Sequence, residues 1–205
     1  FIFGEVDFVK YKNIGNINGE VILAGVPKFD ALFPLRKLKK ANNYTNIGLA
    51  LNLIDESDKI LMVIQRILDE TNYNIIVRMH PGDKRIFKIN SEMVSFHNAK
   101  DQPITEFLEK IGLLLAGESS IHLEALYYNI HSFHINLTSG VIKDHYEFLK
   151  YKLVTEFKIN EISTEYIKNL IKKTNTFDKV KLFIHSYGSK HDGRVGEFIK
   201  SEIYK

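Results

Sequence analysis

The tripeptide His80-Pro81-Gly82 could bring an imidazole ring to an anionic ligand. It lies in the segment "NIIVRMHPGDK" (74–84), in which strand-forming and apolar residues lead up to the histidine. Pro81 has no amide proton and disfavours a helical conformation at His80, so the histidine is expected to be held extended. Gly82 has no side chain, which leaves room for a ligand to approach.

A second stretch, "AGESSIHLEAL" (116–126), could bind the same kind of ligand. Ser119 and Ser120 offer hydroxyl groups beside the free amides at the start of a predicted helix, a combination that favours a phosphate group. Glu124 lies four residues beyond Ser120, above the same rim of the helix. A carboxylate in that place can accept hydrogen bonds from a vicinal diol such as a ribose.

Each of these features also has a purely structural interpretation. A histidine at the end of a strand is often a turn residue, two serines before a helix often cap it, and Glu124 alone could be a solvated helix residue. The ligand interpretation rests on their coincidence, because both stretches follow strands that we expect to end at the same edge of one sheet. We therefore favour a ligand site at that edge.

The rest of the chain alternates predicted strands and helices. The expected strands are 46–54, 74–80, 93–98, 112–118, 131–136 and 152–158, and the expected helices include 57–72, 104–111 and 119–129. Ser57 or Asp55 is the expected cap of helix 57–72. Continuous apolar strands separated by helices indicate an α/β fold, with a parallel Rossmann-like sheet covered by helices on both faces. Such sheets bind ligands beyond the carboxyl ends of their strands.

The first 40 residues follow a different pattern. The segment "EVILAGVPKFDAL" (20–32) predicts a short strand, and a basic, polar connector follows at 35–44. We interpret residues 1–40 as the tail of a preceding N-terminal domain with its linker, and residues 41–205 as one Rossmann-like domain. The chain starts without methionine and in the middle of a pattern, so we expect it to be a fragment of a longer protein.

Composition excludes several classes of protein. The 205 residues include no cysteine, which excludes disulfides and thiolate metal sites and fits a reducing compartment. The net charge of +3 is scattered along the chain, so we expect no nucleic-acid partner. No apolar run approaches the roughly 20 residues of a transmembrane helix. No Asp-x-Asp triplet occurs and no histidine pair has ligand spacing, so we expect no metal site.

The two stretches together resemble the C-terminal, nucleotide-sugar-binding half of GT-B-fold glycosyltransferases. "VRMHPGDK" is followed some forty residues later by "AGESSIHLEAL". The pair is most similar to bacterial surface-polysaccharide enzymes: sialyltransferases, Kdo transferases of capsule assembly, and glycerophosphotransferases of teichoic acid synthesis. "VILAGVPKFDAL" and "HDGRVGEFI" (191–199) resemble segments that leave the N-terminal domain and end the C-terminal domain of such enzymes.

The resemblance implies a role for each candidate residue. His80 would contact the donor phosphate and help the nucleotide leave, while Pro81 and Gly82 would shape that turn. The hydroxyls of Ser119 and Ser120 would hold the same phosphate. The remaining candidates are Glu124, for the ribose hydroxyls, and Lys143, Asp144 and His145, which would either face the donor sugar or cap the next helix.

The expected function is therefore the donor-binding half of a metal-independent glycosyltransferase or glycerophosphotransferase of surface-polysaccharide synthesis. The donor would be a nucleotide-activated sugar, with a cytidine-linked one favoured, and no further cofactor is expected. We expect a cytoplasmic location, with peripheral association at the inner face of the membrane, and no transfer without the missing N-terminal domain. The alternatives are a domain similar to UDP-GlcNAc 2-epimerases and a non-catalytic module of polysaccharide assembly.

Overall fold

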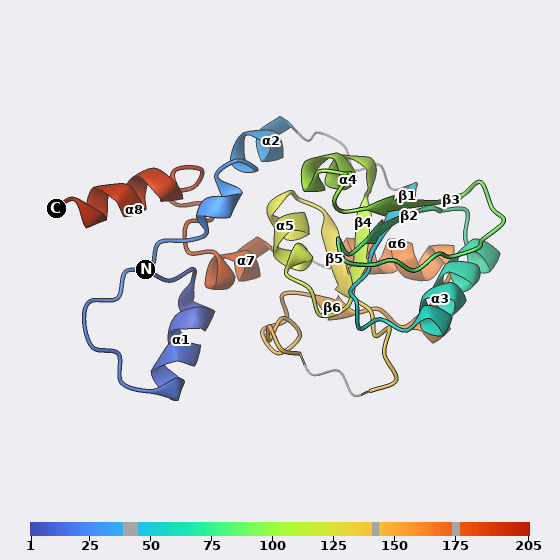
Figure 1. The fold of residues 1–205 in the computed structure, drawn as a ribbon, viewed down its shortest axis with the longest axis horizontal. Helices are drawn as coiled ribbons and strands as arrows, with labels where there is room; N and C mark the ends of the chain where they lie inside the picture. The colour runs from blue at the N-terminus through green and yellow to red at the C-terminus, as the bar shows by residue number, and fades with distance from the viewer. Residues whose placement is uncertain (39–44, 141–143, 174–176) are drawn as a thin grey trace. The chain divides into compact units, whose positions relative to one another are not determined.

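The computed structural model describes residues 1–38, 45–140, 144–173 and 177–205 (Figure 1). The chain divides into two compact units. The sheet unit contains residues Ala41–Ala125 and Ile130–Asn175, and the terminal unit contains Phe1–Lys40, Leu126–Asn129 and Thr176–Lys205. The division expected from the sequence, between a tail of a preceding domain and a donor-binding domain, stays a prediction.

The sheet unit is built on six parallel strands in the order β3-β2-β1-β4-β5-β6. The strands are β1 (Asn46–Ala50), β2 (Asn74–Met79), β3 (Val94–Asn98), β4 (Leu113–Ala116), β5 (His131–His134) and β6 (Thr155–Glu156). The helices are α3 (Ser57–Glu70), α4 (Ile104–Lys110), α5 (Ile121–Tyr127), the short 3₁₀ helix η2 (Ile159–Glu161) and α6 (Thr164–Lys173). The parallel, Rossmann-like α/β sheet expected from the sequence is confirmed.

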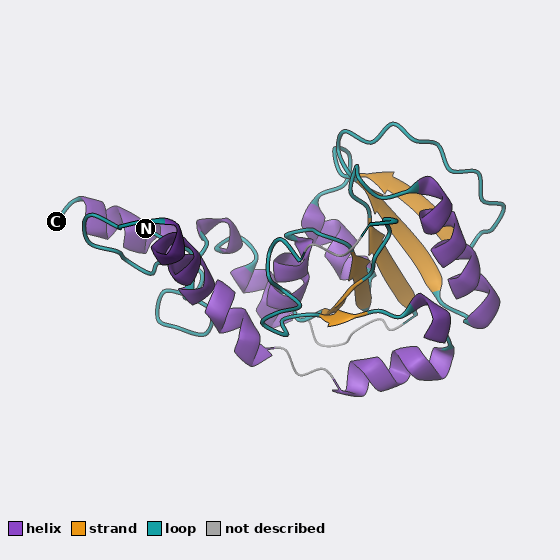
Figure 2. Cartoon of the chain, turned by 90° about the horizontal axis from the view of Figure 1, so that it is seen from below, coloured by secondary structure: helices purple, strands orange, loops and turns teal. Residues whose placement is uncertain are grey.

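Helices cover both faces of this sheet (Figure 2). One face buries alternate residues of the inner strands, such as Ile47 and Leu49 of β1, against α3 and residues of α6. Gly48, between those two residues, faces α4: a Cβ added there would lie 2.5 Å from Ile111 Cδ1 and 2.8 Å from Phe107 Cζ. Glycine at this position therefore lets the α4 segment pack directly on β1.

The start of α3 differs from the sequence-based expectation. Its N-cap residue is Glu56, and no side chain caps the helix there. The carboxylate of Asp55 instead accepts a hydrogen bond from the amide of Asn52 at 2.6 Å, which closes the turn after β1. The expected cap by Ser57 or Asp55 is therefore wrong, because a turn that precedes the helix occupies Asp55.

The terminal unit brings together the two ends of the chain. Its elements are α1 (Glu5–Ile14), the 3₁₀ helix η1 (Pro27–Phe29), α2 (Phe33–Leu38), α7 (Phe177–Phe183) and α8 (Val195–Ile203). Asp30 accepts hydrogen bonds from the amides of Val195 and Gly196, at 2.9 and 2.8 Å. An N-terminal carboxylate thus satisfies the first amides of the last helix.

Asp192 forms the buried polar centre of the same unit. It accepts hydrogen bonds from the hydroxyl of Tyr127, from the Arg36 guanidinium at 2.9 Å and from the amide of Gly188 at 2.8 Å. The Arg36 guanidinium also lies 5.0 Å from the centre of the Tyr127 ring. The segment "HDGRVGEFI" therefore packs on residues that precede the sheet and on the end of α5.

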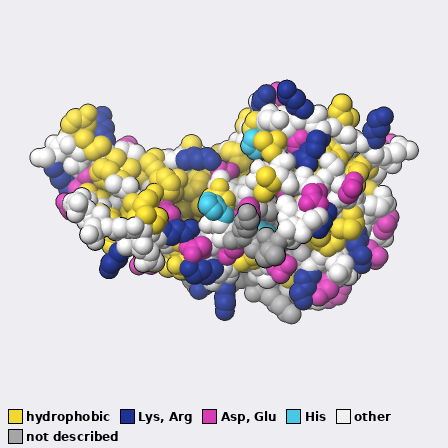
Figure 3. Space-filling model, turned by 60° about the horizontal axis from the view of Figure 1, so that its bottom comes forward, with side chains coloured by type: hydrophobic (Ala, Val, Ile, Leu, Met, Phe, Trp, Pro, Cys, Tyr) yellow, Lys and Arg dark blue, Asp and Glu magenta, His cyan; other side chains and the backbone are white. Residues whose placement is uncertain are grey.

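The surface of the terminal unit carries exposed apolar side chains (Figure 3). The large ones are Phe1, Phe3, Val9, Tyr11, Ile14, Ile17, Ile203 and Tyr204. Within the described ranges, no helix combines the length and the apolar character needed to cross a bilayer.

Candidate functional site

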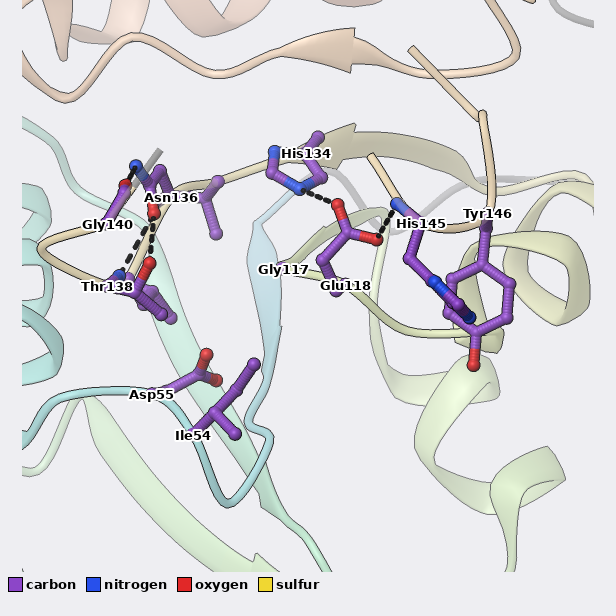
Figure 4. Close-up of a pocket in the computed structure, with 12 residues that line it drawn as sticks. Ile54, Asp55, Gly117, Glu118, His134, Asn136, Thr138, Gly140, His145 and Tyr146 are labelled. Carbon is purple, nitrogen blue, oxygen red and sulfur yellow. Dashed lines mark hydrogen bonds and ion pairs between the residues drawn. The ribbon is translucent and has the colours of Figure 1, made fainter. Parts of the chain in front are cut away.

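A cavity of about 480 Å³ lies at the carboxyl ends of β1, β4 and β5 (Figure 4). Its lining comes from residues 54–55 after β1, 117–118 after β4, and 134–138, 140 and 145–146 from the end of β5 onward. β1 and β4 are neighbours in the sheet, whereas the chain continues from β1 to β2 on its other side. The cavity therefore lies at the topological switch point, where open α/β sheets bind ligands.

Glu118 connects the segments around this cavity. Its Oε1 atom accepts a hydrogen bond from His134 Nε2 at 3.2 Å, and its Oε2 atom accepts one from the amide of His145 at 3.0 Å. Its carbonyl oxygen accepts a third from Asn52 Nδ2 at 2.9 Å. The Nδ1 atom of His134 is buried without a hydrogen-bond partner among the described residues. Water or a ligand usually satisfies such an atom.

A second histidine, His122 of α5, lies behind the cavity. Its Nε2 is 2.9 Å from the carbonyl oxygen of Gly117, and its Nδ1 is 2.6 Å from the Ser132 hydroxyl. A carbonyl can only accept, so Nε2 carries the proton and Nδ1 accepts from Ser132. Complete burial lowers the pKa of His122 to about 4, so the ring is neutral at physiological pH. The hydrogen bond from His122 to the Gly117 carbonyl fixes the turn after β4.

Asp55 directs a carboxylate toward the cavity from the turn after β1 (Figure 4). The residue is only 5% exposed. Burial raises the pKa of Asp55, while the hydrogen bond from Asn52 and the charges of Arg85 and His134 oppose that effect. Gly117 borders this side chain: a Cβ added at Gly117 would lie 3.5 Å from Asp55 Oδ1, an ordinary van der Waals contact.

Arg85 holds the turn after β1 in place. Its guanidinium donates to the carbonyl oxygens of Asn52, at 3.1 Å, and of Asp55. The same group bonds Asp83, with Nε to Oδ1 at 2.9 Å, and this lowers the pKa of Asp83. One side chain thus joins the turns after β1 and β2.

The loop after β5, residues 136–140, forms one wall of the cavity and is bonded to the start of α3. Glu56 accepts hydrogen bonds from the Ser139 amide at 2.5 Å and from the Ser139 hydroxyl at 2.6 Å. The Ser139 hydroxyl is the main reason that the pKa of Glu56 is lowered. Lys59 donates to the carbonyl oxygen of Thr138 at 2.9 Å. Two side chains at the start of α3 therefore anchor residues 138 and 139 of this loop.

His80 lies directly after β2, as the sequence predicts, and it is half-buried. The Gly82 amide donates to His80 Nδ1 at 3.0 Å, and the Asp83 amide donates to the His80 carbonyl at 2.8 Å. His80, Pro81 and Gly82 thus form a tight turn. None of the three lines the cavity.

Ser119 and Ser120 precede α5 at the end of β4. The Ser119 hydroxyl accepts from the amide of Ile121 at 3.4 Å, a long hydrogen bond, and Ser120 is exposed. Glu124 is 6% exposed, and its charge acts on Arg78 of β2. The serines and the end of β2 are separated by β1, so their strand ends lie about 10 Å apart. Convergence of His80 and the serines on one phosphate stays a prediction.

Two of the three candidates after β5 can be placed. Asp144 accepts hydrogen bonds from the amides of Leu149 and Lys150, at 3.0 and 2.8 Å, so it fixes its own loop. His145 lines the cavity. Lys143 lies outside the described residues. Contact of these residues with a donor sugar stays a prediction.

The residues that build the cavity were mostly missed from the sequence. They are Asp55, Glu118 and His134. Glu118 could have been found, because it adjoins Ser119 at the carboxyl end of a predicted strand. Together these side chains present hydrogen-bond acceptors to a small cavity, an arrangement suited to a ligand with hydroxyl groups. Within the described residues, no three acidic or histidine side chains form a metal-ligand cluster.

Neither a protein-family model nor a curated protein matches the sequence. Solved structures do match. A putative UDP-N-acetylglucosamine 2-epimerase from Listeria monocytogenes aligns over 98% of this chain and 58% of its own, with 14% identity and a TM-score of 0.59. The glycosyltransferase SnogD from Streptomyces nogalater aligns over 91% of this chain and 48% of its own, with 13% identity and a TM-score of 0.54. The wall teichoic acid polymerase TagF aligns over 92% of this chain and 52% of its own, with 16% identity and a TM-score of 0.51.

These likenesses establish the fold. The chain spans about half the length of the solved proteins that it matches. The glycosyltransferases among them have the GT-B fold, and this chain has the fold of one half of it. The half-domain fold implied by the sequence motifs is therefore confirmed.

Proposed function

We propose that this chain is the donor-binding half of a GT-B glycosyltransferase or glycerophosphotransferase, and that it binds a nucleotide-activated group at the carboxyl edge of its sheet. The observation that carries the proposal is the cavity at the switch point between β1 and β4, in a fold shared with glycosyltransferases. A nucleotide would extend from this cavity along the turns after β4 and β2. That path passes Ser119, Ser120 and His80.

The geometry of His80 suits contact with a phosphate. Because the Gly82 amide donates to Nδ1, the neutral ring carries its proton on Nε2. Nε2 could then donate to a phosphate oxygen and stabilise the charge that develops as the nucleotide leaves. His80 is the residue to which we assign this role. Pro81 and Gly82 would shape its turn, and Glu124 would serve the ribose.

A cytidine-linked donor and a role in bacterial surface-polysaccharide synthesis extend the proposal. They are supported by the pairing of a His-Pro stretch with a serine stretch, and by the fold shared with a wall teichoic acid polymerase. Besides the donor, the expected partner is the protein's own N-terminal domain. Without that domain we expect nucleotide binding but no transfer. The setting would be the cytoplasm, at the inner face of the membrane.

A thermal-shift panel with CMP, CDP, UMP and UDP tests the proposal. A nucleotide at roughly 100 times its dissociation constant should stabilise the chain by about 2.7 kcal/mol. The variant His80→Ala should lose most of that shift. His97→Ala, on the neighbouring strand β3, is the matched control and should keep it. A chain that no nucleotide stabilises would refute the proposal.

An epimerase-like domain is the second candidate, favoured by the alignment over 98% of this chain with a putative UDP-N-acetylglucosamine 2-epimerase. The same panel separates the two. Stabilisation by UDP alone would move the assignment toward an epimerase or a uridine-dependent transferase, whereas stabilisation by CMP or CDP would support the first candidate.

A further inference from the structure

We infer that the cavity beside Asp55 and Glu118 takes a neutral, hydroxyl-rich group and disfavours a group that carries a carboxylate. The inference rests on the proposed function, because the transferred group of the donor would occupy this cavity. It narrows the donor to those with a neutral sugar or polyol. Donors whose sugar carries a carboxylate would fit poorly.

The first observation is the carboxylate of Asp55. Its Oδ2 atom accepts from the Asn52 amide at 2.6 Å, while within the described chain no hydrogen bond reaches Oδ1. Figure 4 shows this carboxylate directed into the space between Thr138 and Glu118. A carboxylate oxygen that faces the cavity in this way is an acceptor that a ligand hydroxyl can satisfy.

The second observation is the charge of Glu118, on the opposite side of the same space. Both of its carboxylate oxygens are already held, by His134 Nε2 and by the His145 amide. The carboxylate is therefore fixed in position and cannot turn away from a ligand. A ligand carboxylate placed between Asp55 and Glu118 would face two like charges at short range.

The third observation is that nearby cations are used elsewhere. Lys59 donates to the Thr138 carbonyl at 2.9 Å, and Arg85 binds Asp83 and the backbone behind the turn after β1. Among the lining residues that the structure describes, two are acidic, two are histidines and none is lysine or arginine. One of the histidines, His134, already bonds Glu118 through Nε2.

The apolar part of the lining also suits a sugar. Tyr146 lines the cavity and stacks on Phe148, with ring centres 5.2 Å apart. Ile54 and Leu137 add apolar surface on the other sides. A ring that carries hydroxyl groups on its edge and C–H groups on its faces can use both kinds of surface.

The test compares two glycosides by NMR titration of the whole 205-residue chain. Methyl glucoside and methyl glucuronide differ only at C6, which is the carbon of a hydroxymethyl group in one and of a carboxylate in the other. The glucoside should shift the amide signals of Gly117, Thr138 and Gly140 at neutral pH. Its dissociation constant should be at least ~10-fold lower than that of the glucuronide, as expected for a like-charge contact.

Two variants make the test specific. Asp55→Asn keeps an acceptor for the Asn52 amide but removes the charge, so it should narrow the ratio of the two dissociation constants to about threefold. Asp58→Asn removes the same charge from an exposed position on α3 and should leave the ratio unchanged.

Three results would overturn the inference: equal binding of both glycosides, no shift with either, or an unchanged ratio in Asp55→Asn. The outcome is separable from that of the nucleotide panel. If nucleotides bind and the glucoside does not, the inference fails and the proposed function stands. If the glucoside binds with the expected preference and no nucleotide binds, the inferred preference of the cavity stands and the proposed function fails.

Discussion

Glu118 and His134 join the ends of two neighbouring strands, with Glu118 Oε1 accepting a hydrogen bond from His134 Nε2 at 3.2 Å. The second oxygen of the same carboxylate accepts from the His145 amide at 3.0 Å. One side chain therefore connects the end of β4 with the end of β5 and with the loop that carries His145. The position of that loop should depend on this carboxylate.

Replacement of Glu118 by alanine should release the His145 loop. The lost hydrogen bond to an ionised acceptor is worth about 1.5 kcal/mol, so exchange of the His145 amide should become roughly tenfold faster. Hydrogen exchange followed by NMR measures this rate. Glu161→Ala, which removes an exposed partner of Lys158, is the control and should leave it unchanged. Equal rates in wild type and Glu118→Ala would show that other contacts fix the loop.

His122 should make the protein less stable as the pH falls from about 6.5 to about 4. Burial lowers the pKa of the folded-state ring, so between these values the unfolded chain binds more protons than the folded one. The cost over this window should be on the order of 3 kcal/mol, and no further loss from His122 is expected below it.

Urea unfolding at several pH values measures this dependence. His122→Gln should flatten it, because the substituted side chain does not titrate. His185→Gln changes an exposed histidine and should reproduce the wild-type curve. A curve that keeps its slope in His122→Gln would assign the pH dependence to other groups.

Arg85→Ala should destabilise the protein by about 2 kcal/mol, because it leaves the buried Asp83 carboxylate without its partner. It should also loosen the turn that carries Asp55. Arg85→Lys keeps the charge but cannot span the carboxylate and two carbonyl oxygens, so an intermediate loss is expected. Chemical denaturation measures both values.

Arg66→Ala is the control for this pair of variants. Arg66 donates one exposed hydrogen bond, to the carbonyl of Asn160 at 3.2 Å, so its removal should cost much less. If Arg85→Ala and Arg66→Ala had the same effect, the network around Arg85 would not contribute to stability.

Asp30→Ala should weaken the start of α8. The carboxylate bonds the amides of Val195 and Gly196, and loss of such a cap costs about 1 kcal/mol. Amide exchange at these two residues and the loss of helical circular dichroism on heating measure the effect. Asp30→Asn retains one acceptor oxygen and should retain part of the stability. A result with Asn as damaging as Ala would assign the effect to charge.

The sheet could be predicted from the sequence because parallel strands are buried on both faces, so that "NIGLA" and "NIIVRM" are predominantly apolar. The residues at which these strands end could not be predicted. β1 stops at Ala50, four residues before the predicted end, because the chain turns at residues 52–55. That turn depends on Arg85, thirty or more residues away, and its contact with the turn is invisible in a local pattern.

The edge of the sheet that carries the cavity could be indicated from the sequence, whereas most of its lining could not. The rule for carboxyl ends of strands pointed to this edge, and His145, which lines the cavity, was among the selected residues. Asp55 was expected to cap a helix, and His134 was not selected. His134 gains its place from Glu118 on another segment, so no spacing in the sequence marks it. Asp55 is held by the Asn52 amide within its own turn.

The joining of both chain ends in the terminal unit limits how this protein can be trimmed for production. A shortened polypeptide that starts at residue 41 would keep α7 and α8 yet lose α1, which contacts α7, and Asp30, which bonds the first amides of α8. It would also lose Arg36, which bonds Asp192. Asp192 would then be left in the interior with fewer donors, and apolar side chains of α7 would meet water. Expression trials should therefore retain or remove residues 1–40 and 177–205 as a pair.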